Sequence, residues 1–168
     1  METSLSVQHF WPMVSAASAA LTVLAVFLLP VINTYIRKKS VLQIIQNELS
    51  ETARQMEGIC RAWEARKNIT DGSTGYNEVM VMEAIAKRIS CECWDRFRFE
   101  LDPDAYQCLK PFFIAAKDTI DPRASLASND PEKIDPFTLA QMRATYATDF
   151  LAQLKKTAPK CKYLRLPR

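Results

Sequence analysis

Glycine and histidine are scarce in this chain. Its 168 residues include three glycines and a single histidine, His9, against nine prolines. A β-sandwich needs many glycine turns, so this scarcity argues against that class, and the 48% of hydrophobic residues favours helices separated by prolines. We predict an all-α fold with room for one membrane anchor and one modest domain.

Charge is missing from the N-terminal part of the sequence. From Thr3 to Ile36 there is no Asp, Glu, Lys or Arg, and the only side chain that can be charged near neutral pH is that of His9. The apolar core Met13–Ile36 would be about 36 Å long as a helix at ~1.5 Å per residue, which exceeds the roughly 30 Å of bilayer hydrocarbon. A soluble helix without a polar face would need more surrounding protein than the chain provides. We therefore predict a transmembrane helix at 13–36, after a short outer segment at 1–12.

Basic residues flank only one end of this helix. Lysine and arginine are retained on the cytoplasmic side, and the flank 37–40 is basic, whereas Glu2 is the only charge near the other end. No basic region precedes the apolar run, so we expect an uncleaved signal anchor with the N-terminus outside and the following domain in the cytoplasm. The side chains predicted to lie at the membrane interface are Phe10, Trp11, Tyr35, Arg37, Lys38 and Lys39.

The predicted span carries one face of small and polar side chains. At about 100° per residue they fall within an arc of about 60°. These residues are Ser15, Ser18, Thr22 and Asn33. Such a stripe mediates helix contacts in lipid, which favours self-association or a partner helix. In the alternative interpretation, the hydroxyls bond the carbonyls one turn earlier and need no partner.

Five cysteines follow the apolar segment, and an odd number cannot pair completely within one chain. We expect reduced thiols, in agreement with a cytoplasmic domain. Asn68-Ile69-Thr70 matches a glycosylation sequon, which would be inert on that side. Cys91 and Cys93 point about 200° apart on a helix, so they cannot share a metal ion without unwinding.

Apolar residues after the basic flank predict a helical body at 41–157. The first stripe repeats at spacings of three and four, as in a coiled coil, and continues from the span with little interruption. Its residues are Leu42, Ile45, Leu49, Thr52, Met56, Ile59 and Trp63. Turn residues at 68–75 reverse the chain. A second stripe then predicts one helix that pairs with the first, through Val79, Met82, Ala86, Ile89, Cys93 and Phe97.

Two Asp-Pro pairs predict the starts of two more helices. Asp102-Pro103 opens a helix that Pro111 kinks or divides, and Asp135-Pro136 opens the last one after a loop near 118–136. The stripe of the last helix is Leu139, Met142, Tyr146, Phe150 and Leu154. We therefore expect a small antiparallel bundle of three to four cytoplasmic helices.

The charges of the body and of its end differ in sign. Val41–Leu154 holds 13 basic and 18 acidic side chains, a net charge of −5, so no nucleic-acid partner is expected. The end is purely basic, with Lys155, Lys156, Lys160, Lys162, Arg165 and Arg168. Near an anionic leaflet each would gain about 1 kcal/mol, so the tail 158–168 is a candidate lipid-binding segment, into which Tyr163, Leu164 and Leu166 could insert. The alternative is a solvated, disordered end.

Two further sets of residues that carry charge need no binding role. Trp94–Phe99 alternates aromatic and basic residues, which could stack nucleobases or bind an anionic partner. On a helix these residues scatter over several faces, so we expect ordinary packing, in which arginine stems cover aromatic surface. The glutamates of the first helix lie beside its stripe and are predicted to form a solvated face. They are Glu48, Glu51, Glu57 and Glu64.

No catalytic or cofactor signature is found in this sequence. His9 is predicted to lie across the membrane from every cysteine, which argues against a histidine-assisted nucleophile. Gly72 and Gly75 lack the Lys-Ser or Lys-Thr of a phosphate loop. We expect no cofactor and no enzyme activity, but a membrane-tethered helical module that binds a protein partner. The alternatives are a small subunit of a membrane complex, which would use the polar stripe, and an unrecognised enzyme that uses acids and thiols.

Overall fold

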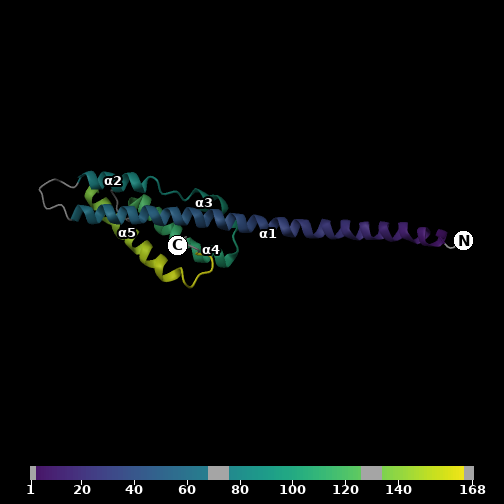
Figure 1. Cartoon of the computed structure of the whole chain (residues 1–168). Coiled ribbons are helices and arrows are strands. Elements are labelled where there is room, and N and C mark those ends of the chain that lie inside the picture. The colour runs from purple at the N-terminus through teal and green to yellow at the C-terminus, as the bar shows by residue number, and fades with distance from the viewer. Residues whose placement is uncertain (1–2, 68–75, 126–133, 165–168) are drawn as a thin grey trace. The chain divides into compact units, whose positions relative to one another are not determined.

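The computed structural model describes residues 3–67, 76–125 and 134–164, and the chain is 87% helical. The described residues contain no strand, so the predicted all-α class is confirmed. In chain order the elements, shown in Figure 1, are α1 (Thr3–Lys67), α2 (Tyr76–Ala86), α3 (Glu92–Phe97), the 3-10 turn η1 (Arg98–Glu100), α4 (Pro103–Ile120), the 3-10 turn η2 (Pro122–Ser125) and α5 (Pro136–Thr157).

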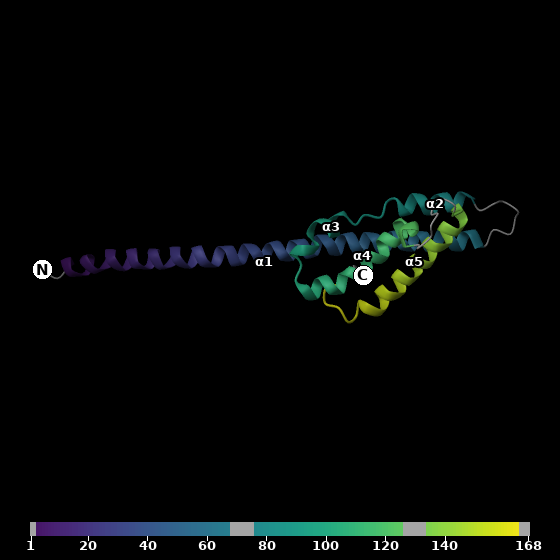
Figure 2. The same ribbon diagram turned by 180° about the vertical axis from the view of Figure 1, so that it is seen from behind.

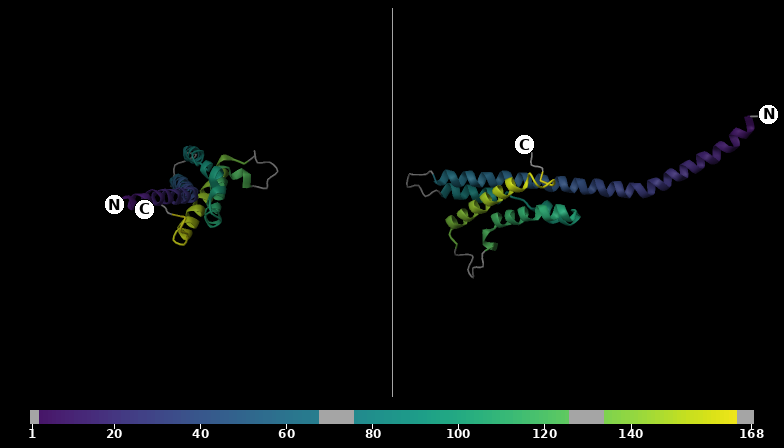
Figure 3. Two further views of the ribbon diagram at one scale, coloured as in Figure 1. Left: turned by 90° about the vertical axis from the view of Figure 1, so that its right-hand side faces the viewer. Right: turned by 90° about the horizontal axis from the view of Figure 1, so that it is seen from below.

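The chain divides into two compact units, Met1–Ser40 and Val41–Arg168. The described part of the first unit is the N-terminal stretch of α1, which is curved (Figure 3). In the part of the chain that the structure describes, α1 is the one helix long and apolar enough to cross a membrane. Its most apolar window has a mean hydropathy of 2.1 and no buried residue. Phe27, for example, is 71% exposed.

The second unit, called the folded unit from here on, buries the predicted stripe of α1. Ile45, Leu49, Thr52, Met56 and Ile59 are buried in it, and Leu42 and Trp63 are half-buried. Helix α2 returns beside this part of α1 (Figure 2). A Cβ atom on Gly58 would lie 3.3 Å from Cδ1 of Ile85, so the missing side chain lets the two helices approach closely.

The prediction of one helix over the second stripe is wrong. Helix α2 ends at Ala86 and α3 begins at Glu92, and the residues between them are not helical. A hydrogen bond from Arg88 N to Ile85 O tightens the last turn of α2. The N-terminus of α3 is stabilised by a carboxylate of α1, which is described in the next section. The buried side chains of the stripe still face the core, since Val79, Met82, Ala86 and Ile89 are buried.

Both Asp-Pro pairs precede a helix, as predicted. At α5, the Asp135 carboxylate accepts hydrogen bonds from Phe137 N at 2.9 Å and Thr138 N at 3.0 Å. Pro111 lies inside α4 without dividing it. Helix α4 continues to Ile120, beyond the predicted start of the loop.

The end of α4 is set by Pro122, because the residue before a proline is disfavoured in a helix. The preceding residue, Asp121, has φ −127° and ψ 84° and is no longer helical. The residues 126–133 of the predicted loop lie outside the described part.

The buried face of α5 is rotated from the predicted one. Met142 and Tyr146 are only half-buried, whereas the buried residues are Leu139, Ala140, Ala144, Ala147, Phe150 and Leu154. The alanines allow α5 to approach α4 closely. Phe112 of α4 meets Phe150 edge-on, with 5.7 Å between the ring centroids.

Trp94 of α3 packs against α4 and is 2% exposed. Its ring is stacked on Tyr106 at 5.4 Å and on Phe113 at 4.7 Å, between centroids. Offset stacks of this kind add about 0.5–1.5 kcal/mol to the burial of their apolar area. The expectation of ordinary packing for Trp94 is confirmed.

The expectation that all five cysteines are reduced is wrong for one pair. Cys108 of α4 and Cys161, after α5, form a disulfide, while Cys60, Cys91 and Cys93 are free. An odd number of cysteines forbids complete pairing but not a single bond. Only the packing of the chain after α5 against α4 decides which two cysteines meet.

The described part of the predicted tail, 158–164, packs on the rest of the folded unit through Leu164. Gln46 of α1 donates a hydrogen bond from Nε2 to the carbonyl oxygen of Tyr163 at 2.6 Å. Leu164 is 5% exposed. The prediction that Leu164 inserts into lipid is therefore wrong, because its side chain belongs to the core. Leu166 lies outside the described residues.

Candidate functional site: a groove beside Glu48

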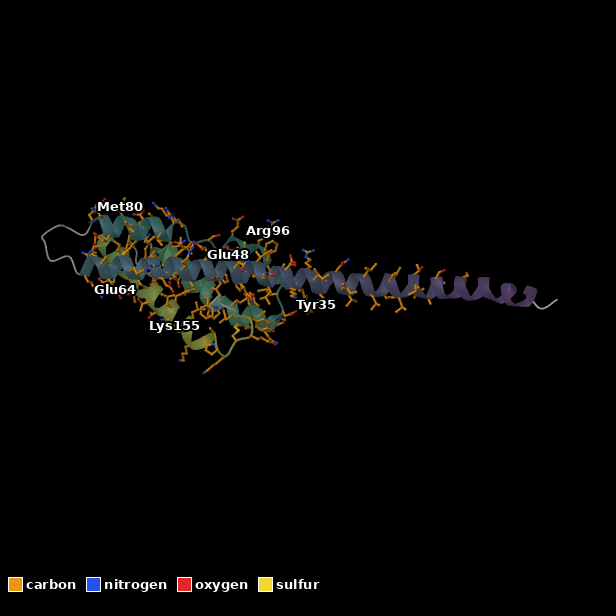
Figure 4. The ribbon with its side chains drawn as sticks, viewed as in Figure 1. Tyr35, Glu48, Glu64, Met80, Arg96 and Lys155 are labelled. Atoms are coloured by element: carbon orange, nitrogen blue, oxygen red, sulfur yellow. A yellow bond between two sulfur atoms is a disulfide. The ribbon has the colours of Figure 1, made fainter. Side chains whose placement is uncertain are left out.

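The carboxylate of Glu48 joins α1 to the start of α3. Its Oε1 accepts hydrogen bonds from Ser90 Oγ at 3.0 Å and Cys93 N at 2.9 Å, and its Oε2 accepts one from Trp94 N at 2.9 Å. Ser90 Oγ in turn accepts a hydrogen bond from Glu92 N at 3.2 Å. Figure 4 labels Glu48 on α1 and Arg96 on α3.

This contact replaces a local helix cap. The first N–H groups of a helix have no partner within the helix, and a negative charge is favoured at that end. Cys91 occupies the cap position of α3 and provides no side-chain hydrogen bond. Glu48 therefore caps α3 from another helix, with charge-assisted hydrogen bonds.

The sequence interpretation missed this role of Glu48. We predicted a solvated carboxylate, but Glu48 is half-buried and bound, whereas Glu51, Glu57 and Glu64 are exposed. Its partners lie 42 to 46 residues further along the chain, so no local pattern marks it. The absence of a usual capping residue at Cys91 is the one signal that could have pointed to a distant cap.

A groove of about 360 Å³ runs beside this cap. Its surface is mostly apolar, and it lies between α1 and the segment that joins α2 to α3. Thr52 and Ile89 are buried beneath it, and Ile44 remains 41% exposed at its edge. The charged side chains that line it include Glu51 and Arg88.

The thiols near the groove are poor nucleophiles. Burial, followed by the charge of Glu48, raises the pKa of Cys93. Burial raises the pKa of Cys91 to about 12. Both thiols are therefore protonated at neutral pH, whereas nucleophilic catalysis needs a thiolate.

The acid at the rim of the groove is ionised at neutral pH. The hydrogen bond from Arg54, followed by the one from Gln55, lowers the pKa of Glu51. The groove can therefore hold an apolar side chain beside fixed charges. Among the described residues, no group of three or more His, Cys, Asp or Glu side chains could hold a metal ion.

A comparison with family models, curated proteins and solved structures found no match.

Two hydroxyls of the polar stripe donate hydrogen bonds within their own helix. Ser18 Oγ donates to Ser15 O at 3.0 Å, and Thr22 Oγ1 donates to Ser18 O at 2.8 Å. Asn33 is exposed. The hydroxyls of Ser18 and Thr22 thus have acceptors within their own helix, as in the alternative interpretation, and contact with a second helix stays a prediction.

The structure describes the side chains of only some of the residues predicted to lie at the membrane interface. The side chains of Phe10 and Trp11 are among those that are not described. Tyr35 is 69% exposed. The basic flank, Arg37, Lys38 and Lys39, is also exposed.

The basic residues near the C-terminus lie in two places. Lys155, labelled in Figure 4, and Lys156 are exposed in the last turn of α5. Lys160 and Lys162 are exposed in the packed segment that follows. Arg165 and Arg168 lie outside the described residues. Lipid binding by this set stays a prediction.

Proposed function

We propose that this chain is a membrane-tethered, non-enzymatic interaction module, in which a transmembrane helix carries a small antiparallel helical bundle that binds a protein partner. The observation that carries the proposal is the apolar part of α1, whose large side chains have no cover of protein. Exposure of such a surface to water is unfavourable by about 25 cal/mol per Å². A bilayer provides the cover that the chain does not.

The groove beside Glu48 is the proposed docking site for the partner. It is mostly apolar, it keeps Ile44 exposed, and the Glu48 cap fixes one of its walls. A matching partner presents an apolar side chain for the groove and polar groups for Glu51 and Arg88. The raised pKa of Cys93 supports a binding role over an enzymatic one.

Affinity purification of the full chain from detergent tests this proposal. Ile44→Lys should abolish recovery of a partner that the wild type retains, because binding would then bury a charged side chain in place of an apolar one. Ile114→Lys is the matched control, since Ile114 is 49% exposed on α4 and lies away from the groove. Recovery of the intact wild-type protein alone and monomeric would count against the proposal.

The basic flank supports a cytoplasmic folded unit with the N-terminus outside. The Cys108–Cys161 disulfide favours the opposite orientation, because such bonds are rare in the cytosol. The sequon at Asn68 distinguishes the two when the chain is inserted into microsomes. If the folded unit is cytoplasmic, Asn68 is not glycosylated, and glycosidase treatment does not change the mass of the protein. A higher mass that disappears on glycosidase treatment and in Asn68→Gln would overturn the proposed orientation.

The polar stripe supports a second candidate, a small subunit of a membrane complex. Cross-linking in the membrane through a cysteine introduced at Ser18 tests it. Adducts with another transmembrane protein are expected from this role, and a monomer alone would contradict it.

A further inference from the structure

Phe99 is the most exposed large apolar side chain among the described residues. It lies in η1, between α3 and α4, and is 79% exposed. Its neighbours Phe97 and Leu101 are half-buried and pack against the core. The turn is thus anchored on both sides, and it holds one aromatic ring in solvent.

Contacts before and after Phe99 in the sequence join its segment to α1 a short way after Val41, within the folded unit. Glu48 binds the start of α3, six residues before Phe99. Gln46 binds Tyr163, in the segment that a disulfide joins to Cys108 on α4. Figures 1 and 2 agree that α3 and the start of α4 lie at the end of the folded unit that contains the beginning of its stretch of α1.

The chain length limits how far this end can lie from a bilayer. This step rests on the proposed transmembrane helix, which ends at Ile36, five residues before Val41. Five residues span about 8 Å as a helix and at most about 18 Å when extended, whatever the relative placement of the two units. The headgroup layer itself is roughly 5–8 Å thick.

We propose that the turn at Phe99 is a membrane-docking site that inserts into the headgroup layer of the bilayer holding the anchor. The Arg98 guanidinium lies over the Phe99 ring, at 4.7 Å from its centroid. Arg96 lies over Phe97 at 5.1 Å. An aromatic ring can reach the acyl boundary while the guanidinium stays with the phosphates, as amphipathic side chains do at membrane interfaces.

The local charge favours apolar insertion over attraction to anionic lipid. Acidic side chains at Asp95, Glu100, Asp102 and Asp104 accompany the two arginines. Arg98 also lies 3.6 Å from Asp95 Oδ1. The turn therefore has no net positive charge, and docking should not require an anionic leaflet.

Photo-cross-linking of the full chain in phosphatidylcholine nanodiscs tests this site. Phe99→p-benzoylphenylalanine should form lipid adducts that mass spectrometry detects. The matched control is Tyr76→p-benzoylphenylalanine, at the start of α2, where the aromatic side chain is 60% exposed. Its adduct yield should be at least about five-fold lower, because apolar contact with lipid is lost within a few ångströms of the interface.

The same substitution at Phe27 separates this proposal from the proposed anchor. Lipid adducts at position 27, together with equal yields at positions 99 and 76, would support the proposed anchor and overturn the proposed docking site. The absence of lipid adducts at position 27 would overturn both proposals. Adducts from position 99 to protein instead of lipid, or a yield that rises several-fold when phosphatidylserine is added, would also overturn apolar insertion.

Discussion

Removal of the Glu48 carboxylate should destabilise the folded unit without affecting the apolar part of α1. In Glu48→Ala, Cys93 N and Trp94 N lose the acceptors that now lie at 2.9 Å. A buried donor left without a partner costs about 1–3 kcal/mol, and loss of a helix cap typically costs about 1 kcal/mol. Because the site is half-buried, water recovers part of this loss, and we expect a decrease of about 2–3 kcal/mol in the free energy of unfolding.

Glu48→Gln should have a smaller effect of about 1 kcal/mol, since the amide keeps one oxygen acceptor but loses the charge. Glu57→Ala is the matched control on the exposed face of the same helix and should change stability by less than about 0.5 kcal/mol. Urea unfolding of the full chain in mild detergent, followed by near-ultraviolet circular dichroism, reports on the stacked Trp94.

Hydrogen exchange gives the local measurement for the same variants. The amides of Cys93 and Trp94 should exchange faster in Glu48→Ala than in the wild type, while those of α5 should change only through global unfolding. If Glu48→Ala and Glu57→Ala have the same stability and the same exchange at these two amides, the carboxylate does not cap α3, and the account of the α2–α3 break is wrong.

Three further predictions concern the cysteines and a close helix contact. Cys108→Ser should lower the free energy of unfolding by about 2–4 kcal/mol, since the disulfide closes a loop with a sequence separation of 53, and mass spectrometry should find the wild type two hydrogens lighter than its reduced form. Because the pKa of Cys91 is raised, its contribution to the free energy of unfolding should be fully present below about pH 9 and should be lost as the pH rises toward 12. Cys91→Ala should make this alkaline loss of stability smaller in urea titrations, and an unchanged dependence of stability on pH would refute the role of Cys91. Gly58→Leu should destabilise the folded unit by about 1–3 kcal/mol in thermal unfolding, because its side chain would collide with Ile85, whereas equal stability would show that α1 and α2 are loosely packed.

Much of the helical structure could be predicted from short-range patterns. The apolar run ahead of Ser40 requires no partner to be recognised, and the spacing of Ile45, Leu49 and Met56 defines one buried face. Asp135-Pro136 marks a helix start, because a capping carboxylate and a fixed φ act within one turn. These features depend on residues that are neighbours in the sequence.

The features that the sequence interpretation missed depend on contacts between distant residues. The stripe through Val79 and Phe97 has a helical period, yet the helix is interrupted within it, because the Glu48 carboxylate caps the N-terminus of a second helix, α3. The rotated face of α5 follows from the close approach to α4, which favours Ala144 over Tyr146 at the contact. Hydrophobic periodicity does not specify how closely two helices pack.

The sequence by itself determined that this protein is helical and that the stretch from Thr3 to Ile36 is apolar, with His9 as its only residue that can be charged near neutral pH, since both follow from composition and local spacing. Only the tertiary structure decided that Glu48 is a cap and not part of a solvated face, that Cys108 pairs with Cys161, and that Leu164 belongs to the core. The physical reason is the same for all three. Each role depends on the partner that folding brings to the side chain, and that partner lies more than forty residues away along the chain or on another element.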